Sequence, residues 1–523
     1  VRHDMSRIRK AAITAAFTYV QFGLAIVTGI ILVPLTLHYL GARSWGLWLA
    51  TGELLGYAGM TDLGILGVLP WMIAEADGRG DRLAMRRLVG HGVWLGCGVA
   101  VAYAAAAALL WSFLPSVLRF TAGDRQLVFA PFVLLVIANA ISHPFRVFRA
   151  TIGGLQDAWF NGVMSIVQSS LTITITATLL VKGYGLYALA CAAGVPPIVV
   201  FALCLVRLRA TARDLMTGWS VPNFAEARHL LTNGTGTWLG ALGWQMLAST
   251  NAIVITYLGR PEWVPIYSCT AKLSLMTTQL VWVPPDSALV ALAQLHGERT
   301  GVERLRHVVL MMLRLHLLLS GAALCGILAF NPAFVTWWVG SAFFGGLGVS
   351  SVIAIGVVVY SLSHGLVTTA SVVGQRMKVG IAAVVNGAVQ IGLALAFGQL
   401  WSLNGIAAAG LLASLLTSIP AGVLLLRPAT ELSAGHLMKE LVGPWLTRAG
   451  AFFAVAAVAG LFSRTLGLAL SGLVAALICA GYIWHMRPLY VGLPLDARLV
   501  EWLVRVRLLP RAHVASEPVM DRA

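Results

Sequence analysis

Long apolar runs recur along the whole chain, and they constrain its fold more than any other feature. Each is about 20 residues or longer, the length that a helix needs to cross the hydrocarbon core of a bilayer. About fourteen such runs occupy 11–33, 47–71, 93–115, 127–148, 160–181, 184–206, 232–258, 265–291, 308–330, 347–372, 379–398, 403–426, 444–463 and 466–486. Charged residues make up only 11% of the chain, against about 25% in a typical soluble domain. We therefore predict an all-α polytopic membrane protein with about fourteen transmembrane helices.

Arginine and lysine residues alternate between the segments that connect these runs. Most of the 36 lie on segments that would all face one side of the membrane. The opposite segments carry only Arg43, Arg119, Arg125, Lys182, Arg260 and Arg464. By the positive-inside rule, this alternation predicts that the N- and C-termini are both cytoplasmic. Membrane topology accounts for the net charge of +16, so we expect no nucleic-acid partner.

Short segments of similar sequence recur about 219 residues apart. YLGARSW at Tyr39–Trp45 corresponds to YLGRPEW at Tyr257–Trp263, and Ser142-His143-Pro144 corresponds to Ser363-His364-Gly365. Each half of this repeat contains six apolar runs. Because six is an even number, both halves are expected to enter the membrane in the same orientation.

The repeat predicts two parallel six-helix lobes, residues 1–207 and 230–427, around a central cleft. They would be related by a pseudo-two-fold axis along the membrane normal. Two C-terminal helices at 444–486 and a basic cytoplasmic tail at 487–523 lie outside the repeat. This layout is typical of a transporter whose two lobes rock to give alternating access.

Four segments resemble a known family. They are Val33–Gly64, Ile73–Val89, Gly154–Val163 and Gly183–Ala190, and they include the Tyr-Leu-Gly and Asp-Leu-Gly signatures. These segments are similar to Wzx-type polysaccharide and O-antigen flippases of the multidrug/oligosaccharidyl-lipid/polysaccharide (MOP) exporter superfamily. The fourteen runs and the two six-helix lobes fit the lipid-flipping branches of that superfamily.

The resemblance implies a flippase of the bacterial inner membrane. Its substrate would be a polyprenyl-pyrophosphate-linked oligosaccharide, moved from the cytoplasmic to the periplasmic leaflet for surface polysaccharide biosynthesis. The expected partners are this lipid-linked substrate, membrane lipid and other polysaccharide assembly proteins. The identity of the glycan does not carry over. Coupling to a proton or sodium gradient is an open expectation.

Cations inside or beside the predicted spans are candidates for binding pyrophosphate, because an ionisable group within a membrane span is costly unless it has a function. Lys272 lies in the run 265–291, and Arg314 lies near the inner end of 308–330. Arg146 and Arg149 follow His143 at the cytoplasmic mouth. Two other interpretations remain open: Arg314 could snorkel to the interface, and Arg146 and Arg149 could be ordinary positive-inside residues.

Glu53 and Lys272 occupy equivalent places in the two halves of the repeat. Groups related by a central two-fold axis can meet near that axis, so we predict that this pair forms an outer gate when the cleft faces inward. Alternatively, each side chain finds a partner within its own lobe. Cysteines at the two positions would cross-link in one transport state if the gate exists.

Other titratable residues are candidates for gating or ion coupling: Asp62, Asp286, His143 and His364. Each could instead form a hydrogen bond between helices. Pro284 and Pro285 immediately precede Asp286, and proline removes a helical hydrogen bond. We therefore predict a hinge at these two prolines.

Two other function classes compete with this one. A drug or organic-cation exporter of the same superfamily, coupled to protons or sodium, would favour acidic and aromatic groups in its cleft. A membrane enzyme is not expected, because the sequence shows neither an HExxH motif nor a nucleophile elbow nor a phosphate-binding loop. The six cysteines lie singly inside apolar runs without metal-ligand spacing, so neither a metal nor another cofactor is expected.

Overall fold

The computed structural model describes residues 2–222, 224–286, 288–297 and 301–490, and this part of the chain is helical without strands. The chain divides into two compact units. Unit 1 comprises the residues up to Pro265 together with Ala383–Gln399, and unit 2 comprises Ile266–Ala382 and the residues from Leu400 onward. The all-α fold is confirmed. The lobe boundaries drawn from the repeat stay a prediction, and the tail predicted at 487–523 lies mostly outside the described residues.

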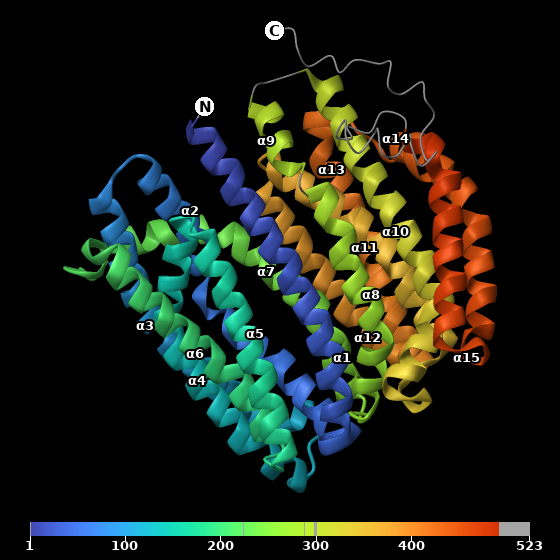
Figure 1. The fold of residues 1–523 in the computed structure, drawn as a ribbon, viewed down its shortest axis with the longest axis horizontal. Helices are drawn as coiled ribbons and strands as arrows, with labels where there is room; N and C mark the ends of the chain where they lie inside the picture. The colour runs from blue at the N-terminus through green and yellow to red at the C-terminus, as the bar shows by residue number, and fades with distance from the viewer. Residues whose placement is uncertain (1, 223, 287, 298–300, 491–523) are drawn as a thin grey trace. The chain divides into compact units, whose positions relative to one another are not determined.

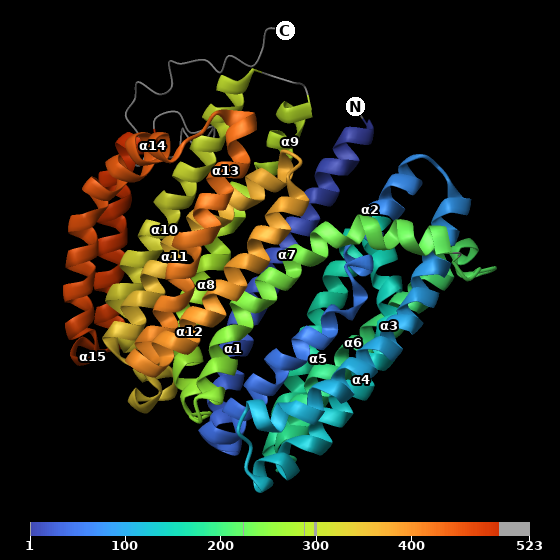
Figure 2. The same ribbon diagram turned by 180° about the vertical axis from the view of Figure 1, so that it is seen from behind.

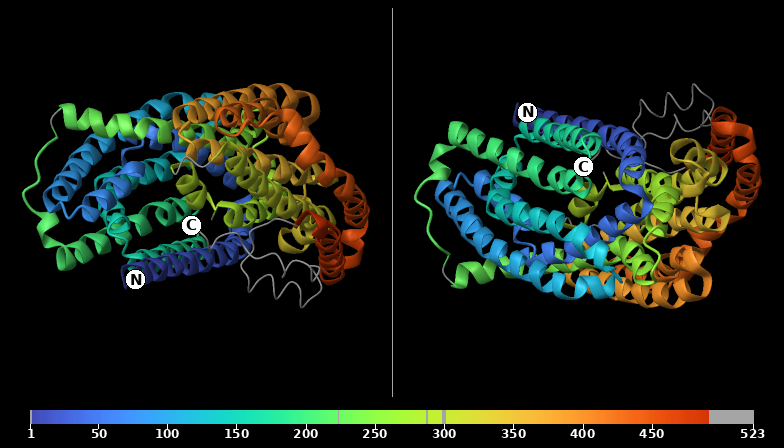
Figure 3. Two further views of the ribbon diagram at one scale, coloured as in Figure 1. Left: turned by 90° about the horizontal axis from the view of Figure 1, so that it is seen from above. Right: turned by 90° about the horizontal axis from the view of Figure 1, so that it is seen from below.

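Unit 1 is built from the first half of the chain. Its helices are α1 (Arg2–Ala58), the 3₁₀ helix η1 (Gly59–Asp62), α2 (Ile65–Gly78), α3 (Arg82–Val117), α4 (Ala122–Gly154), α5 (Ala158–Val181), α6 (Leu186–Thr211), the 3₁₀ helix η2 (Arg213–Met216) and α7 (Phe224–Tyr257). Helix α4 packs against α3 and α6, and α5 packs against α1 and α6 (Figure 1). The end-on views in Figure 3 show α1 running beside α5.

Local sequence explains where helices of unit 1 begin. The Thr121 side chain accepts a hydrogen bond from the backbone N–H of Asp124, and the Asp124 carboxylate accepts one from the N–H of Thr121. This capping box satisfies two N–H groups at the start of α4. Asp81 caps α3 in a similar way by accepting a bond from Ala84.

The remaining helices belong to unit 2, apart from the first residues of α8 and the middle of α12. They are α8 (Trp263–Asp286), α9 (Leu289–Gly297), α10 (Val302–Val339), the 3₁₀ helix η3 (Ser341–Phe343), α11 (Gly346–Val372), α12 (Arg376–Ala413), the π-helix η4 (Ser414–Ser418), α13 (Ile419–Thr430), α14 (Ala434–Leu437), the π-helix η5 (Met438–Val442), α15 (Gly443–Met486) and the 3₁₀ helix η6 (Arg487–Tyr490). Helix α10 packs against both α11 and α15 (Figure 2). The core between them is fixed by Tyr482, whose hydroxyl accepts a 2.8 Å bond from the Trp445 indole.

Nine helical stretches of the described residues are long and apolar enough to cross a membrane. Three of them contain a non-helical residue that divides them into two arms: Gly41 in α1, Ser402 in α12 and Gly467 in α15. The φ angles at these three residues are 71°, 53° and 74°. Positive φ angles of this size interrupt a right-handed helix. The breaks fall between predicted runs that neighbour each other. The chain is therefore a multi-pass membrane protein.

Helices α7 and α8 cover the predicted runs 232–258 and 265–291, but they are not among the nine. Polar side chains lie within both helices, including Gln245 and Lys272. The arrangement of fourteen spans in two lobes stays a prediction.

Two runs predicted as continuous helices are interrupted. The run 47–71 is broken where α1 ends at Ala58 and α2 begins at Ile65. Leu63 and Gly64 adopt left-handed backbone conformations there, and the Gly64 N–H donates to the Asp62 side chain instead of to a helical carbonyl. In the run 265–291, α8 ends at Asp286 and α9 begins at Leu289. The prediction of an unbroken helix was wrong over 47–71, whereas a hinge at Pro284 and Pro285 was already predicted within 265–291.

Candidate functional site

The break between α1 and α2 in unit 1 makes specific contacts with α7. The indole N–H of Trp238 in α7 donates a 2.7 Å hydrogen bond to the Met60 carbonyl within the break. Gly64 lies so close to Gly234 of α7 that a Cβ on Gly64 would come within 2.6 Å of the Gly234 carbonyl oxygen. The non-helical segment is therefore enclosed by α7, as backbone polar groups at membrane depth must be.

Asp62 lies at this break, within electrostatic range of Arg146. Asp62 closes η1 and accepts a 3.2 Å hydrogen bond from the backbone of Gly64. The half-buried Arg146 of α4 forms neither a hydrogen bond nor an ion pair with any described residue, and its guanidinium is under the electrostatic influence of Asp62. A predicted anion-binding residue and a predicted coupling residue thus share one region of unit 1.

Arg149, unlike Arg146, is held by hydrogen bonds to neighbouring side chains. Its guanidinium donates to Asn161 at 3.3 Å, to Gln168 at 2.7 Å and to Ser165 at 2.8 Å, all on one face of α5. These three acceptors are neutral, so they orient the guanidinium without cancelling its charge. The arrangement suits a rigid cation whose charge remains available to an anion.

Glu53 has a hydrogen-bond partner inside unit 1. Its carboxylate accepts a 2.7 Å bond from the hydroxyl of the fully buried Ser249 of α7. That hydroxyl in turn accepts a 2.6 Å bond from Gln245, which also donates to the Glu53 carbonyl. Lys272 belongs to unit 2, and a gate between Glu53 and Lys272 stays a prediction.

A cluster of aromatic and titratable side chains lies in unit 2 around His364 of α11. Nε2 of His364 is 3.0 Å from Oδ2 and 3.1 Å from Oδ1 of Asp286, which ends α8. The ring of Trp282, one turn earlier on α8, stacks on the imidazole with a centroid distance of 3.9 Å and an interplanar angle of 3°. His316 of α10 meets the same imidazole edge-on at 5.8 Å.

The structure also places the remaining predicted residues. Lys272 and Arg314 are half-buried, and neither makes a hydrogen bond or an ion pair within the described ranges. His143 is fully buried beside the Tyr103 ring, and neither of its ring nitrogens has a described hydrogen-bond partner. Pro284 and Pro285 occupy the last turn of α8. Their role as a hinge stays a prediction.

Sequence reasoning missed several residues of these sites, among them Trp238, Trp282 and His316. Trp282 and Asp286 are four residues apart on one helix, a spacing that places side chains on the same face. This spacing was a usable signal. Trp238 and His316 gave none, because their roles depend on packing against segments that are distant in sequence.

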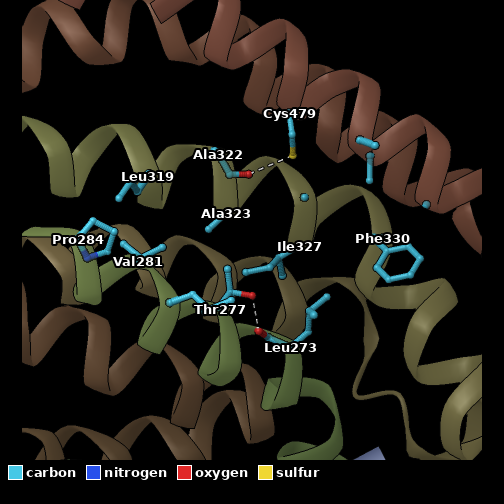
Figure 4. Close-up of a pocket in the computed structure, with 15 residues that line it drawn as sticks. Leu273, Thr277, Val281, Pro284, Leu319, Ala322, Ala323, Ile327, Phe330 and Cys479 are labelled. Atoms are coloured by element: carbon cyan, nitrogen blue, oxygen red, sulfur yellow. Dashed lines mark hydrogen bonds between the residues drawn. The ribbon is translucent and has the colours of Figure 1, made fainter. Parts of the chain in front are cut away.

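An apolar pocket of about 480 Å³ lies between α8, α10 and α15 of unit 2. Figure 4 shows Val281, Ile327 and Phe330 among its lining residues, with Pro284 at its edge. The Cys479 thiol donates a 3.3 Å hydrogen bond to the Ala322 carbonyl, so this thiol already has a partner within the protein. The lining offers hydrocarbon contact rather than hydrogen bonds.

Comparison with known proteins shows the fold. No family model matches the sequence, and no curated protein matches it. Among solved structures, the lipid II flippase MurJ in an inward closed conformation is similar with a TM-score of 0.66 at 13% identity, over 92% of this chain and 99% of that one. An inward-facing multidrug resistance MATE family transporter of the MOP superfamily is similar with a TM-score of 0.61 at 17% identity, over 79% of this chain and 96% of that one. The outward-facing form of a MATE transporter gives 0.58 at 17% identity, over 80% and 96%. The chain therefore has the fold that these transporters and flippases share.

Proposed function

We propose that this chain is a transporter of the MOP fold that flips a polyprenyl-pyrophosphate-linked oligosaccharide from the cytoplasmic to the periplasmic leaflet of a bacterial inner membrane. The product would serve surface polysaccharide biosynthesis. The lobes alternate access to the polar head while the lipid tail stays in the bilayer. The chain acts as a transporter and not as an enzyme.

The observation that carries this proposal is a set of cations in the predicted spans that have no hydrogen bond or ion pair to any described residue. They are Lys272, Arg314 and Arg146, and all three are half-buried. The carboxylates of Glu53 and Asp62 accept hydrogen bonds from neutral groups of their own unit, and Asp286 lies 3.0 Å from His364.

An unpaired charge in a membrane span costs at least about 2.5–3.5 kcal/mol. A substrate of opposite charge offsets this cost when it binds. Unpaired cations therefore suit an anionic substrate such as a pyrophosphate. The similar MurJ structure is that of a lipid II flippase, which supports a lipid-linked substrate.

The apolar pocket of unit 2 supports the lipid part of the proposal. Its lining of aliphatic and aromatic side chains provides a favourable surface for a hydrocarbon chain, at roughly 25 cal/mol for each Å² removed from water. The resemblance of Val33–Gly64 to Wzx-type flippases supports a surface polysaccharide as the product.

Gene deletion in the native host tests this function. We expect loss of the surface polymer and accumulation of undecaprenyl-linked oligosaccharide in the inner leaflet. The wild-type gene should restore the polymer, Lys272→Gln should not, and Lys182→Gln should, because Lys182 is an exposed residue at the end of α5. Intact polysaccharide together with new sensitivity to cationic drugs would instead establish the alternative, a proton- or sodium-coupled drug exporter.

A further inference from the structure

The pair formed by Asp286 and His364 has the geometry of a proton-binding site. Both carboxylate oxygens of Asp286 lie within 3.1 Å of Nε2 of His364. The side chains are 34% and 21% exposed, so the protein does not bury the pair completely. Histidine is the side chain whose charge changes most readily near neutral pH, and His–carboxylate chains inside membrane proteins are typical of proton relays.

The face of Trp282 stacks on the imidazole of His364. Trp282 lies parallel to the ring at 3.9 Å, and an indole face attracts a cation. The indole N–H donates a 3.2 Å hydrogen bond to Ser361, which fixes its orientation. The imidazolium would thus have a carboxylate at its edge and an indole on its face.

His316 adds a second imidazole to the cluster. It is fully buried, and neither of its ring nitrogens has a hydrogen-bond partner in the described part of the chain. A buried polar group without a partner costs about 1–3 kcal/mol. Gly365 permits this approach, because a Cβ there would lie 2.6 Å from Cδ2 of His316. The imidazole of His316 therefore packs edge-on against the pair without a hydrogen bond to it.

Other charged groups lie on the elements packed around the cluster. They are Arg314 and the segment Glu303–His307 on α10, His296 on α9, Arg427 on α13, and Arg448 and His485 on α15. Among the described charged groups, only Asp286 and His364 act electrostatically on His316. The π-helix η4 contributes a hydroxyl, that of Ser418, which bonds to Ser363.

We propose that Asp286 and His364 are the site where the chain binds and releases the proton that drives transport. The proton adds to the neutral imidazole, and the net charge of the pair changes from −1 to 0. The attraction between α8 and α11 changes with it. That change acts next to Pro284 and Pro285, where α8 lacks backbone N–H donors. This inference rests on the proposed transport function, because a coupling proton has a role only in a transporter.

The first experiment measures coupling in proteoliposomes. The probe is a fluorescent undecaprenyl-pyrophosphoryl disaccharide whose leaflet is determined with a membrane-impermeant quencher. We expect an imposed proton gradient to accelerate flipping by the wild type. His364→Gln and Asp286→Asn should lose this acceleration. His307→Gln, an exposed histidine on α10, is the matched control and should respond as the wild type does.

The second experiment reads the protonation of the pair without transport. A protonated imidazole in contact with an indole quenches its fluorescence more than a neutral imidazole does. Subtracting the emission of Trp282→Phe from that of the wild type gives the emission of Trp282, which should fall in one step as pH is lowered. The same subtraction is made in the His364→Gln background, with the double variant His364→Gln/Trp282→Phe as the reference. There the emission of Trp282 should show no fall with pH. This titration also reports whether the variants retain the native stacking.

The outcomes separate this inference from the proposed function. Gradient-driven flipping that persists in both His364→Gln and Asp286→Asn overturns the inference. Flipping by the wild type that does not respond to a proton gradient also overturns it, while the flippase function stands. If the wild type does not flip the probe, the proposed function fails, and the fluorescence step then decides whether the pair binds a proton.

Discussion

The indole N–H of Trp238 donates a 2.7 Å hydrogen bond to the backbone carbonyl of Met60, which lies 178 residues earlier in the chain. That carbonyl otherwise accepts a longer bond of 3.3 Å from Leu63. Where a helix is broken at membrane depth, neighbouring helices must satisfy the backbone groups that it frees. Trp238 does this for the break between α1 and α2.

Replacing Trp238 by phenylalanine tests the contribution of this bond. Trp238→Phe keeps an aromatic ring and removes the donor, so we expect the free energy of unfolding to fall by about 1–3 kcal/mol. Thermal unfolding of the purified protein in detergent would measure the change. Trp71→Phe is the control, because Trp71 is 61% exposed and its replacement should leave the melting temperature unchanged. Equal melting temperatures for the two variants would contradict the capping role.

The contact between Gly234 and the break requires a glycine. A Cβ on Gly234 would lie 2.7 Å from the Leu63 carbonyl oxygen and 3.0 Å from the carbonyl carbon of Gly64. Both neighbours are backbone atoms that cannot rotate away, so we expect Gly234→Ala to cost about 1–3 kcal/mol of stability. Gly240 on the same helix has no atom within 4 Å of a Cβ. Gly240→Ala should therefore be neutral or stabilising by about 0.5–1 kcal/mol. If both variants unfold at the same temperature, α7 does not pack tightly on the break.

An ion pair joins α1 to the start of α4. Arg43 donates to both carboxylate oxygens of Asp124, at 2.8 Å and 3.3 Å, and Asp124 is 8% exposed. We expect Asp124→Asn to lower the free energy of unfolding by about 1.5–3 kcal/mol, because it weakens charge-assisted bonds. Glu262 lies 3.8 Å from the same arginine, with side chains 46% and 49% exposed. Glu262→Gln should change stability by less than about 0.5 kcal/mol. The two variants can be compared in one thermal unfolding series.

Lys272 should matter for transport and not for stability. It has no hydrogen bond or ion pair among the described residues, so Lys272→Gln should leave the melting temperature unchanged or raise it. The rate of flipping should fall about tenfold to a hundredfold, the equivalent of one charge-assisted bond of about 1.5–3 kcal/mol to the substrate. The flipping assay and thermal unfolding of the same preparation check both expectations.

Arg149 provides the contrasting case. Arg149→Gln removes the donors that bind Asn161, Ser165 and Gln168. We expect the melting temperature to fall, because three hydrogen bonds between α4 and α5 are lost.

A Lys272 variant that unfolds early and still flips substrate would show that Lys272 is a structural residue.

The sequence predicted the membrane-spanning class for a local reason. Whether a segment of about 20 residues partitions into hydrocarbon depends mainly on its own composition. The predicted separation of the runs 444–463 and 466–486 lies close to the break at Gly467. The same reasoning did not locate the break at Asp62, because apolar residues on both sides of 59–64 extend the run across it.

The candidate sites were predicted one residue at a time. Asp286 and His364 were each expected to couple ions, but their sequence positions, 78 residues apart, do not show that they touch. The structure adds Trp282 and His316 to them. It also shows that Glu53 bonds to Ser249, a partner 196 residues away.

By itself, the sequence determined that this chain is an α-helical membrane protein with internal repetition and a few charges at membrane depth. These properties follow from the apolar content of each segment and from the spacing of charges along the chain. Only the tertiary structure decided which charges have partners, which helices are broken and which side chains enclose the breaks. Those outcomes depend on the packing of helices that are remote in sequence, and in a membrane the need to satisfy every buried polar group makes that packing decisive.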